Sequence, residues 1–361
     1  MDASFPSPVG RVGPVQAIAV RTAAALWLFA AGCSTRLERV ARVSVPGGPG
    51  TWVVQLETHP DAEARSAFFL TADGVVGRAN WARGSIEWIA SAETRGRTHH
   101  FSVRSGGRKL AVLSVWMDES RQLVRTTVRI LSGDSGKELN AFAGSDSPAS
   151  DEKLLFAGER DRVIMFGKGT LQALDSQSGQ LIWSRPLPHL GAPEAVLELP
   201  GGRALVDSMF GFSVWDTGCG ELLSQQRVLL TNATVHPSGC EVVGTWGTPH
   251  RSRRLERLVR QRLPHGPRVA QLLGRSGLRQ RCIHLAFRRD GRILAVLVDS
   301  SKHDGRFYVD LYRWSAQSDV RYLGSVRTRQ WCWSVQWTAD GYLAVASGPW
   351  IEIWRLRDQA D

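Results

Sequence analysis

Arginine is the residue type in this sequence that is best suited to binding an anion, and it is concentrated in one segment. Between His250 and Arg281 the chain carries ten arginines and a single acidic residue, Glu256. A guanidinium group can hold a phosphate or a carboxylate through two parallel hydrogen bonds. Six of these side chains are therefore candidate contacts for an anion or a partner: Arg251, Arg253, Arg254, Arg257, Arg260 and Arg262.

The composition of the whole chain gives a second interpretation of these arginines. The 361 residues are 43% apolar and 22% charged, which is typical of a folded globular protein and excludes an intrinsically disordered chain. The formal charge is +11 and the pI is about 10.1. This excess of positive charge favours binding to an anionic partner. A GC-rich genome also produces an arginine excess, and the segment would then be a solvated face without a function.

Cys33 is a candidate for lipid attachment. It follows Arg11, Arg21 and the apolar stretch 23–29, which is too short to span a bilayer but suits the apolar region of a cleaved signal peptide. The residues Ala30-Ala31-Gly32-Cys33 resemble the lipobox of bacterial lipoproteins, although that family most often has Leu where Ala30 stands. The resemblance implies acylation of Cys33, and Ser34 implies sorting to the outer membrane. The alternatives are an ordinary secretory signal or a buried N-terminal helix.

The other four cysteines are an even number, as expected in an oxidising compartment: Cys219, Cys240, Cys282 and Cys332. Cys282 and Cys332 occupy the same place relative to two Asp-Gly turns, so a disulfide between them is a candidate. Equivalent positions in a repeat point the same way, however, and a disulfide needs converging side chains. Buried free thiols are therefore the favoured state of this pair, and a bridge between Cys219 and Cys240 is a still weaker candidate.

Linear motifs for catalysis are missing from the sequence. It has no HExxH, no His and Cys at zinc-binding spacing, no glycine-rich phosphate loop followed by Lys-Ser/Thr, and no Gly-x-Ser-x-Gly. We therefore expect no enzymatic activity, no metal and no cofactor. A hydrolase or lyase whose site is assembled from distant loops is the less favoured alternative.

The elements that must position these residues are indicated by a repeated hairpin in residues 282–354. Each copy has alternating apolar residues, an Asp-Gly turn at Asp290-Gly291 or Asp340-Gly341, and an apolar return strand. Further along the pattern, Gly136, Gly179 and Gly220 recur at the spacing of four-stranded propeller blades, about 40 to 50 residues. At that length the chain after residue 32 accommodates roughly seven blades, with six or eight as alternatives.

Closure of the ring also has a sequence explanation. The last unit runs through Trp354 and stops one strand short, whereas the alternating segment from Arg39 to Val45 stands alone near the start. This early segment could supply the missing outer strand, which would leave no exposed sheet at either end of the ring. The sequence therefore predicts an all-β propeller of seven four-stranded blades closed by an N-terminal strand.

Individual blades resemble known repeat families. The segment Val214-Trp215-Asp216 and the two Asp-Gly hairpins resemble WD-repeat blades, and the segment 173–183 resembles a blade of the quinoprotein propellers. The resemblance implies a fold but not an activity, because propellers include enzymes, scaffolds and binding modules. Within this scheme, residues 252–263 are either a basic amphipathic helix inserted between strands or the third strand of an irregular blade.

Alternating tryptophans in the last unit are a candidate core. Trp331, Trp333, Val335 and Trp337 would share one face of a strand and pack between blades, although Trp331 lies near a loop and could instead be an exposed anchor for a partner.

These observations lead to one domain organisation and one preferred function. Residues 1–32 would be a lipoprotein signal peptide, 33–50 the anchor, tether and closing strand, and 51–361 the propeller with an arginine-rich insertion near 250–281. We expect a monomeric, lipid-anchored scaffold on the periplasmic side of the outer membrane, with surface exposure as a variant, a protein partner in the cell envelope and no nucleic acid. A binding module for an anionic glycan or lipid is the alternative.

Overall fold

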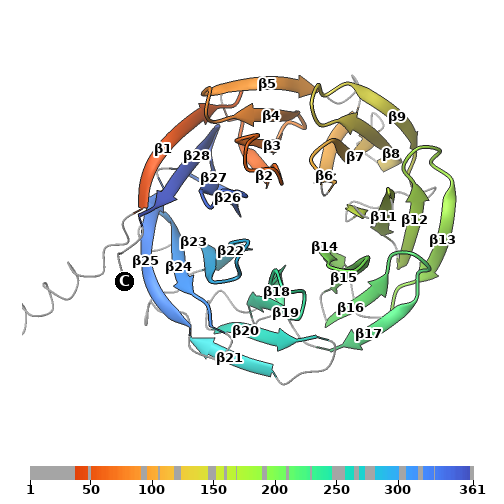
Figure 1. Ribbon diagram of the computed structural model, residues 1–361. Helices are drawn as coiled ribbons and strands as arrows, with labels where there is room; N and C mark the ends of the chain where they lie inside the picture. The colour runs from red at the N-terminus through yellow and green to blue at the C-terminus, as the bar shows by residue number, and fades with distance from the viewer. Residues whose placement is uncertain are drawn as a thin grey trace, which may run out of the picture.

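The computed structural model consists of strands joined by turns and loops. It describes residues 37–47, 50–90, 96–104, 106–117, 123–144, 152–157, 161–167, 169–188, 193–208, 211–227, 230–245, 257–263, 268–272, 281–300, 306–315, 320–328 and 330–357. These residues form 28 strands in seven antiparallel sheets of four strands. The sheets stand around a central axis like the blades of a propeller (Figure 1), so the predicted fold is confirmed.

The first three blades follow one another along the chain. Blade one consists of β2 (Val53–Thr58), β3 (Ser66–Thr71), β4 (Val76–Asn80) and β5 (Ser85–Ala90). Blade two consists of β6 (Gly96–Val103), β7 (Lys109–Met117), β8 (Leu123–Ser132) and β9 (Glu138–Ala143). Blade three consists of β10 (Lys153–Ala157), β11 (Arg162–Gly167), β12 (Thr170–Asp175) and β13 (Leu181–Pro186).

The remaining blades complete the ring in the same order. Blade four consists of β14 (Pro193–Leu199), β15 (Arg203–Ser208), β16 (Gly211–Asp216) and β17 (Leu222–Gln226). Blade five consists of β18 (Thr231–Val235), β19 (Glu241–Thr245), β20 (Arg257–Arg262) and β21 (Arg268–Leu272). Blade six consists of β22 (Arg281–Phe287), β23 (Ile293–Asp299), β24 (Phe307–Arg313) and β25 (Arg321–Thr328). Blade seven consists of β26 (Cys332–Trp337), β27 (Leu343–Ser347), β28 (Trp350–Leu356) and β1 (Leu37–Ser44).

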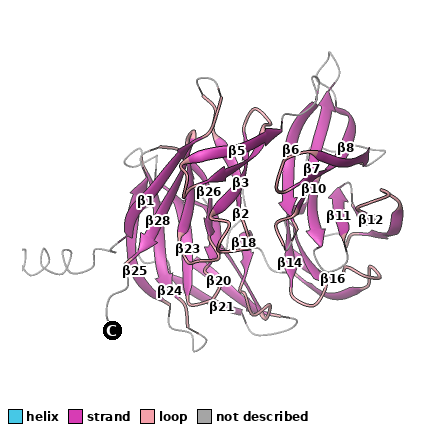
Figure 2. Cartoon of the chain, turned by 45° about the horizontal axis from the view of Figure 1, so that its top comes forward, coloured by secondary structure: helices cyan, strands magenta, loops and turns pink. Residues whose placement is uncertain are grey.

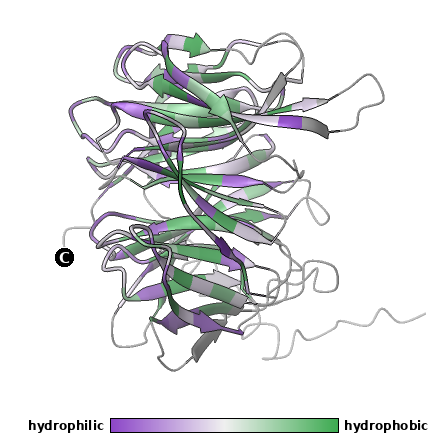
Figure 3. Cartoon of the chain, turned by 90° about the vertical axis from the view of Figure 1, so that its right-hand side faces the viewer, coloured by the Kyte–Doolittle hydropathy of each residue, from purple (hydrophilic) through white to green (hydrophobic). Residues whose placement is uncertain are grey.

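The hydrophobic pattern of each strand matches its place in the blade. The second strand lies between neighbouring blades on both faces, and β3 is buried at every residue. The fourth strand lies at the rim (Figure 2), and β5 alternates between exposed and half-buried residues. A strand covered on both faces reads as a continuous apolar run, and one covered on a single face alternates. Figure 3 shows the resulting apolar layers along the stacked sheets.

Each interface between blades holds its own buried apolar cluster. Phe69 of blade one packs with Ala344 and Ile353 of blade seven, and Phe156 of blade three packs with Leu113 of blade two. Corresponding clusters fill the other five interfaces among the described residues. A single sheet would leave both faces in water, so every blade depends on its two neighbours.

The N-terminal strand closes the ring as predicted. β1 pairs antiparallel with β28 from Leu37 opposite Leu356 to Ser44 opposite Trp350, and Figure 1 shows the two strands side by side. The guanidinium of Arg39 lies 3.0 Å from the carboxylate of the buried Glu352. Both ends of the folded chain are therefore held in one sheet, and neither end of the stack is exposed.

The glycines that revealed the blade length have a shared packing role. Gly136, Gly179 and Gly220 have φ angles of +67°, +70° and +71°, which side chains rarely adopt. Each also receives an aromatic ring from the last strand of the preceding blade. An added Cβ would lie 2.4 Å from Trp88 at Gly136 and 2.7 Å from Trp183 at Gly220. Glycine is required there both by the turn and by the ring of the neighbouring blade.

Gly220→Ala is expected to destabilise the protein more than Gly341→Ala. Gly341 has a similar φ of +84°, but no atom lies within 4 Å of an added Cβ there. Gly341→Ala should therefore cost about 1–2 kcal/mol of unfolding free energy from backbone strain alone. Gly220→Ala should cost roughly a further 1–3 kcal/mol because Trp183 must move. Urea unfolding of both variants measures the difference, and equal losses would contradict the packing role.

Candidate functional site

Three stacked tryptophans form an exposed apolar surface, called here the tryptophan row. Trp52, Trp331 and Trp333 are 38%, 50% and 38% exposed. The ring centroids of Trp52 and Trp331 lie 6.1 Å apart with planes 6° from parallel, and those of Trp331 and Trp333 lie 6.4 Å apart at 28°. The buried ring of Phe307 supports Trp331 at 5.3 Å. Large aromatic side chains seldom stay in water without a role in binding.

Main-chain hydrogen bonds hold the tryptophan row in place. The carbonyl of Trp331 accepts from the amide of Gly348 at 2.8 Å, and the carbonyl of that same glycine accepts from the amide of Val53 at 3.0 Å. The carbonyl of Trp52 accepts from Ala72 at 2.8 Å. The turn between β27 and β28 thus links the segments before β26 and β2, which belong to blades seven and one. The rings are preorganised for contact with a partner.

The position of Trp333 corrects the predicted core. Val335 and Trp337 are buried as expected, but Trp333 is exposed. The register between β26 and β27 shifts between Cys332 and Ser334, so the residue between them leaves the alternating pattern. Trp331 is 50% exposed, so of the two alternatives for this residue the structure excludes a fully buried position between blades.

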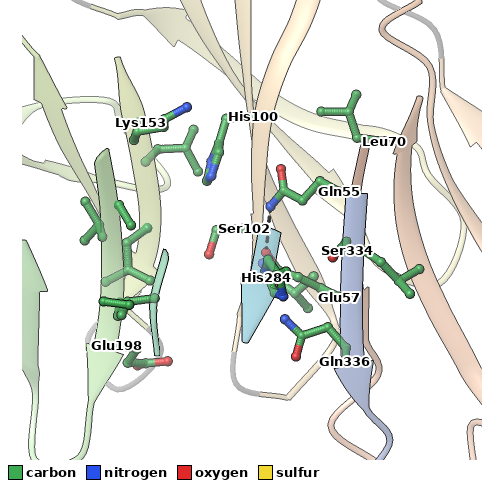
Figure 4. Close-up of a pocket in the computed structure, with 18 of the residues that line it drawn as sticks. Gln55, Glu57, Leu70, His100, Ser102, Lys153, Glu198, His284, Ser334 and Gln336 are labelled. Atoms are coloured by element: carbon green, nitrogen blue, oxygen red, sulfur yellow. Dashed lines mark hydrogen bonds between the residues drawn. The ribbon is translucent and has the colours of Figure 1, made fainter. Parts of the chain in front are cut away.

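The central channel is a second candidate site. A cavity of about 700 Å³ is lined chiefly by the first strands of the blades, which surround the axis. Figure 4 shows side chains from several of these strands, including His100, His284 and Gln336, turned into this space. The volume is in the range of small-molecule sites. The channel can therefore hold a ligand of moderate size.

Carboxylates dominate the charged lining of the channel. Glu57, Glu194, Glu198 and Asp207 contribute four acids, against one lysine, Lys153. Glu57 accepts hydrogen bonds from the amide of Val103 at 2.9 Å and from Gln55 at 3.1 Å. Burial nevertheless raises the pKa of Glu57 to about 7, and the charge of Glu198 adds to the shift. The channel environment therefore favours the neutral form of Glu57 over the ionised form.

Two buried groups in the channel are poorly satisfied. Asp207 is 1% exposed, and neither of its carboxylate oxygens makes a hydrogen bond within the described ranges. Burial raises its pKa to about 8, with repulsion from Glu194 as a further cause, although the nearby amides of Ser208 and Ala233 oppose the shift. Burial also lowers the pKa of His284 to about 4, so this imidazole is neutral at pH 7. Buried polar groups without partners commonly mark functional positions.

Asp207→Asn is expected to stabilise the protein at alkaline pH and to change little at acidic pH. The unfolded carboxyl ionises near pH 3.8, whereas the folded one ionises near 8. Between these values the native state holds the extra proton, so the stability of the unmodified protein falls as pH rises. The variant lacks this loss, so its free energy of unfolding should exceed that of the unmodified protein by a few kcal/mol above about pH 8. Urea unfolding at about pH 5 and about pH 8.5 measures it, with the exposed turn variant Asp73→Asn as control. Equal gains at both pH values would contradict the assignment.

The arginine-rich segment is partly built into blade five. β20 takes residues 257–262 as the third strand, so of the two interpretations left open, the strand is confirmed there and the helix is not found. Arg251, Arg253 and Arg254 lie outside the described residues. Arg257 belongs to β20, and β21 is also drawn from the segment. The described part of the proposed insertion therefore consists of the two outer strands of a blade.

The remaining two candidate arginines differ in exposure. The side chain of Arg262 is 58% exposed and lies 3.9 Å from Glu241. Arg260 is buried, forms an ion pair with Glu241, and donates to the carbonyl of Ser315 at 3.0 Å. Its guanidinium is engaged within the protein, so Arg262 is the only one of the pair that can meet an external anion.

The candidate disulfide between Cys282 and Cys332 does not form, and the favoured state of buried free thiols is confirmed. Cys282 and Cys332 are buried free thiols. They point into different interfaces, the first between blades five and six and the second between blades six and seven. Side chains at equivalent positions of the repeat therefore point the same way around the ring, and the two sulfur atoms do not converge. Burial raises the pKa of Cys332 to about 11, so its thiol stays protonated.

The other cysteines offer no bridge either. Cys219 and Cys240 are exposed free thiols, and Cys33 lies outside the described residues. No cluster of three His, Cys, Asp or Glu side chains suited to a metal ion occurs in the described ranges. The described residues include no helix that is long and apolar enough to cross a membrane.

Sequence reasoning missed the acids of the channel and one of the three members of the tryptophan row, Trp52. Glu57 comes from β2, far along the chain from the consecutive strands β14 and β15 that carry Glu198 and Asp207. A signal was available at β14, where Glu194 and Glu198 stand in the first strand of a blade. Trp52 follows a cluster of Pro and Gly residues, and nothing local connects it with Trp331. Only the closure of the ring brings them together.

Comparison with known proteins reveals the fold alone. No protein family model matches the chain, and no curated protein is similar in sequence. Among solved structures, a crystal structure of the WD40 repeats of RRP9 matches with a TM-score of 0.67 and 15% identity, covering 89% of this chain and 100% of that one. A structure of U3-55K matches with a TM-score of 0.68 and 13% identity, covering 88% and 98%. The chain is a seven-bladed WD40-like β-propeller.

Proposed function

We propose that this propeller is a protein-interaction scaffold that binds its partner through the tryptophan row. The observation that carries the proposal is the parallel stacking of Trp52 and Trp331, both exposed and backed by Phe307. Tryptophan is enriched among the residues that dominate binding energy at protein interfaces. WD40-like propellers typically act as scaffolds, which agrees with a binding role and with the expectation that the protein is not an enzyme.

The geometry favours a protein partner over a small ligand at this surface. The row consists of three partly exposed rings that do not line the central cavity, and it spans the junction of blades seven and one. A partner could cover the rings and desolvate them together, as happens at the centre of protein interfaces. The stacked rings have little rotational freedom to lose on binding, which lowers the entropic cost of association.

The experiment compares Trp331→Ser with Ile89→Ser in quantitative affinity capture from an envelope fraction. Ile89 is 55% exposed on β5 and lies outside the tryptophan row, so it is a matched loss of exposed apolar surface. We expect Trp331→Ser to lose a stoichiometric partner at least ~10-fold while Ile89→Ser keeps it, since loss of a central aromatic costs about 2 kcal/mol or more. Equal retention by two variants of similar melting temperature would overturn the proposal.

The cellular setting is a further part of the proposal. We place the protein on the periplasmic side of the outer membrane, held by a lipid on Cys33. Support comes from the lipobox resemblance of residues 30–33 and from the apolar stretch before them. β1 begins at Leu37, so only a few residues would separate the anchor from the ring.

Metabolic labelling with a palmitate analogue tests the anchor. The native chain should carry the label and sediment with the outer membrane, whereas Cys33→Ala should carry none. An unlabelled, full-length native chain in the soluble fraction would contradict the envelope location. The scaffold proposal would survive that result, because the tryptophan row does not depend on the anchor.

A further inference from the structure

The charge of the central channel is opposite to that of the whole protein. The chain has 45 Lys and Arg against 34 Asp and Glu. The channel lining has the acids Glu57, Glu194, Glu198 and Asp207 and the single base Lys153, while His284 is neutral at pH 7. A channel lined by acids with low-dielectric walls concentrates the potential along the axis. Cations are therefore attracted to the channel, where the protein is locally acidic.

Two acids of the channel lie where their charged forms are disfavoured. Burial raises the pKa of Glu57 and of Asp207, and repulsion by Glu198 and Glu194, respectively, adds to the two shifts. Figure 4 shows Glu57 and Glu198 on different walls of the channel, carried by β2 and β14. A positive group bound in the channel would relieve this repulsion.

Asp207 provides independent support for a ligand. It is 1% exposed and borders the cavity, and neither carboxylate oxygen makes a well-formed hydrogen bond with a described residue, although the amides of Ser208 and Ala233 lie nearby. A buried carboxylate normally has partners, because removing it from water without them is costly. The amide contacts of Glu57 show how a channel acid can be satisfied internally. Asp207 is left with the capacity to accept from a bound molecule.

The lining of the channel selects the kind of cation. No group of three His, Cys, Asp or Glu in the described ranges is placed to hold one metal ion. Four acids distributed over β2, β14 and β15 instead suit more than one positive group on one molecule. Apolar lining residues such as Val196, Leu197 and Leu285 occur among the polar ones and can pack against methylene groups. We propose that the central channel binds an aliphatic polyamine-type cation whose ammonium groups contact the acids Glu57, Glu194, Glu198 and Asp207.

Other charged and titratable groups of the lining define the limits of this site. Lys153 and His100 lie on the first strands of blades three and two, and His284 lies on that of blade six. Lys153 opposes a cation, but the four acids outnumber it, so a ligand with two ammonium groups should bind more tightly than one with a single ammonium. The neutral side chains Gln55 and Gln336 supply amide oxygens that can accept further N–H groups.

Binding should release protons near neutral pH. Glu57 and Asp207 have pKa values of about 7 and about 8, so both are partly protonated there. A cation beside them favours the carboxylate form and lowers those pKa values. Proton release distinguishes this site from nonspecific attraction to acids that are already ionised.

Calorimetric titration of the whole protein with spermidine tests the proposal. The titration is run near pH 7.5 in two buffers of different ionisation enthalpy, on the native protein, on Glu198→Gln and Asp207→Asn, and on Glu221→Gln, an exposed acid outside the channel. We expect saturable binding with proton release, weakened at least ~10-fold in both channel variants and unchanged in the control. Asp207→Asn should be more stable than the native protein, so its loss of binding cannot come from misfolding.

Separate arms identify the source of the ammonium groups. A short peptide with two lysines is titrated beside spermidine and the monoamine butylamine. Tighter binding of the peptide assigns the site to lysine side chains of a protein, and tighter binding of spermidine assigns it to a free polyamine. The proposal is overturned if neither binds more tightly than butylamine, if binding releases no protons, or if Glu221→Gln weakens it as much as Asp207→Asn. Loss of the scaffold partner in Trp331→Ser is a separate readout that does not bear on the channel.

Discussion

Val43→Asp is expected to destabilise the propeller by at least ~3 kcal/mol, because it places a carboxylate inside the closure of the ring. Val43 is 1% exposed on β1, opposite Ile351 of β28. It belongs to the buried cluster between blades seven and one, which also contains Val53 and Phe69. No basic side chain belongs to that cluster, so the new charge would have to ionise at a cost or draw β1 away from β28. Both outcomes weaken the contact that joins the ends of the chain.

Val40→Asp is the matched control for this prediction. Val40 lies on the same strand but is 42% exposed, so a charge there remains hydrated. Thermal unfolding should show a melting temperature lowered by at least ~5 °C for Val43→Asp and changed little for Val40→Asp. Similar behaviour of the two variants would mean that β1 does not carry the closure.

Glu241→Leu is expected to destabilise the protein by about 3–5 kcal/mol, since it leaves the buried guanidinium of Arg260 without its carboxylate partner. The two side chains are 10% and 9% exposed and form a direct ion pair. Arg260 also lies over the ring of Trp314, and the indole of that residue is within 3.4 Å of Glu241. The network connects blades five and six, so its loss should affect their interface.

A double variant separates the ion pair from simple packing. Glu241→Leu with Arg260→Met removes both charges and keeps most of the volume, so it should recover much of the stability lost in the single variant. Glu38→Ala breaks an exposed ion pair with Arg355 and should change the urea midpoint little. A double variant no more stable than Glu241→Leu would show that the charge of Arg260 is not what makes the single change costly.

The fate of Arg260 illustrates why the arginine-rich segment was difficult to interpret. Ten arginines in one stretch suggest a surface for anions, and Arg262 does remain accessible beside the pair. The partner of Arg260, however, is Glu241 on the neighbouring strand β19. A charge in a sequence does not reveal whether its counterion lies in solvent or across a sheet. That depends on the pairing of strands, which blade five establishes.

The sequence by itself determined the architecture of this protein. Alternating apolar residues identified the hairpins, Gly136, Gly179 and Gly220 marked the blade length, and the unpaired strand near Arg39 predicted the closure. These signals succeed because they are local. The side-chain period of two distinguishes a strand, and a glycine at positive φ marks a turn whatever lies elsewhere in the chain. The propeller then follows because each sheet has two apolar faces to cover.

Only the tertiary structure decided where ligands and partners can bind. Trp52 and Trp331 become neighbours because the ring closes, and Trp333 becomes exposed because β26 bulges beside it. Glu57 and Asp207 share one channel because the blades converge on a common axis. Whether side chains distant in sequence meet depends on many strand registers and blade angles together. No local sequence pattern contains that information, so the candidate sites could be identified only in the folded structure.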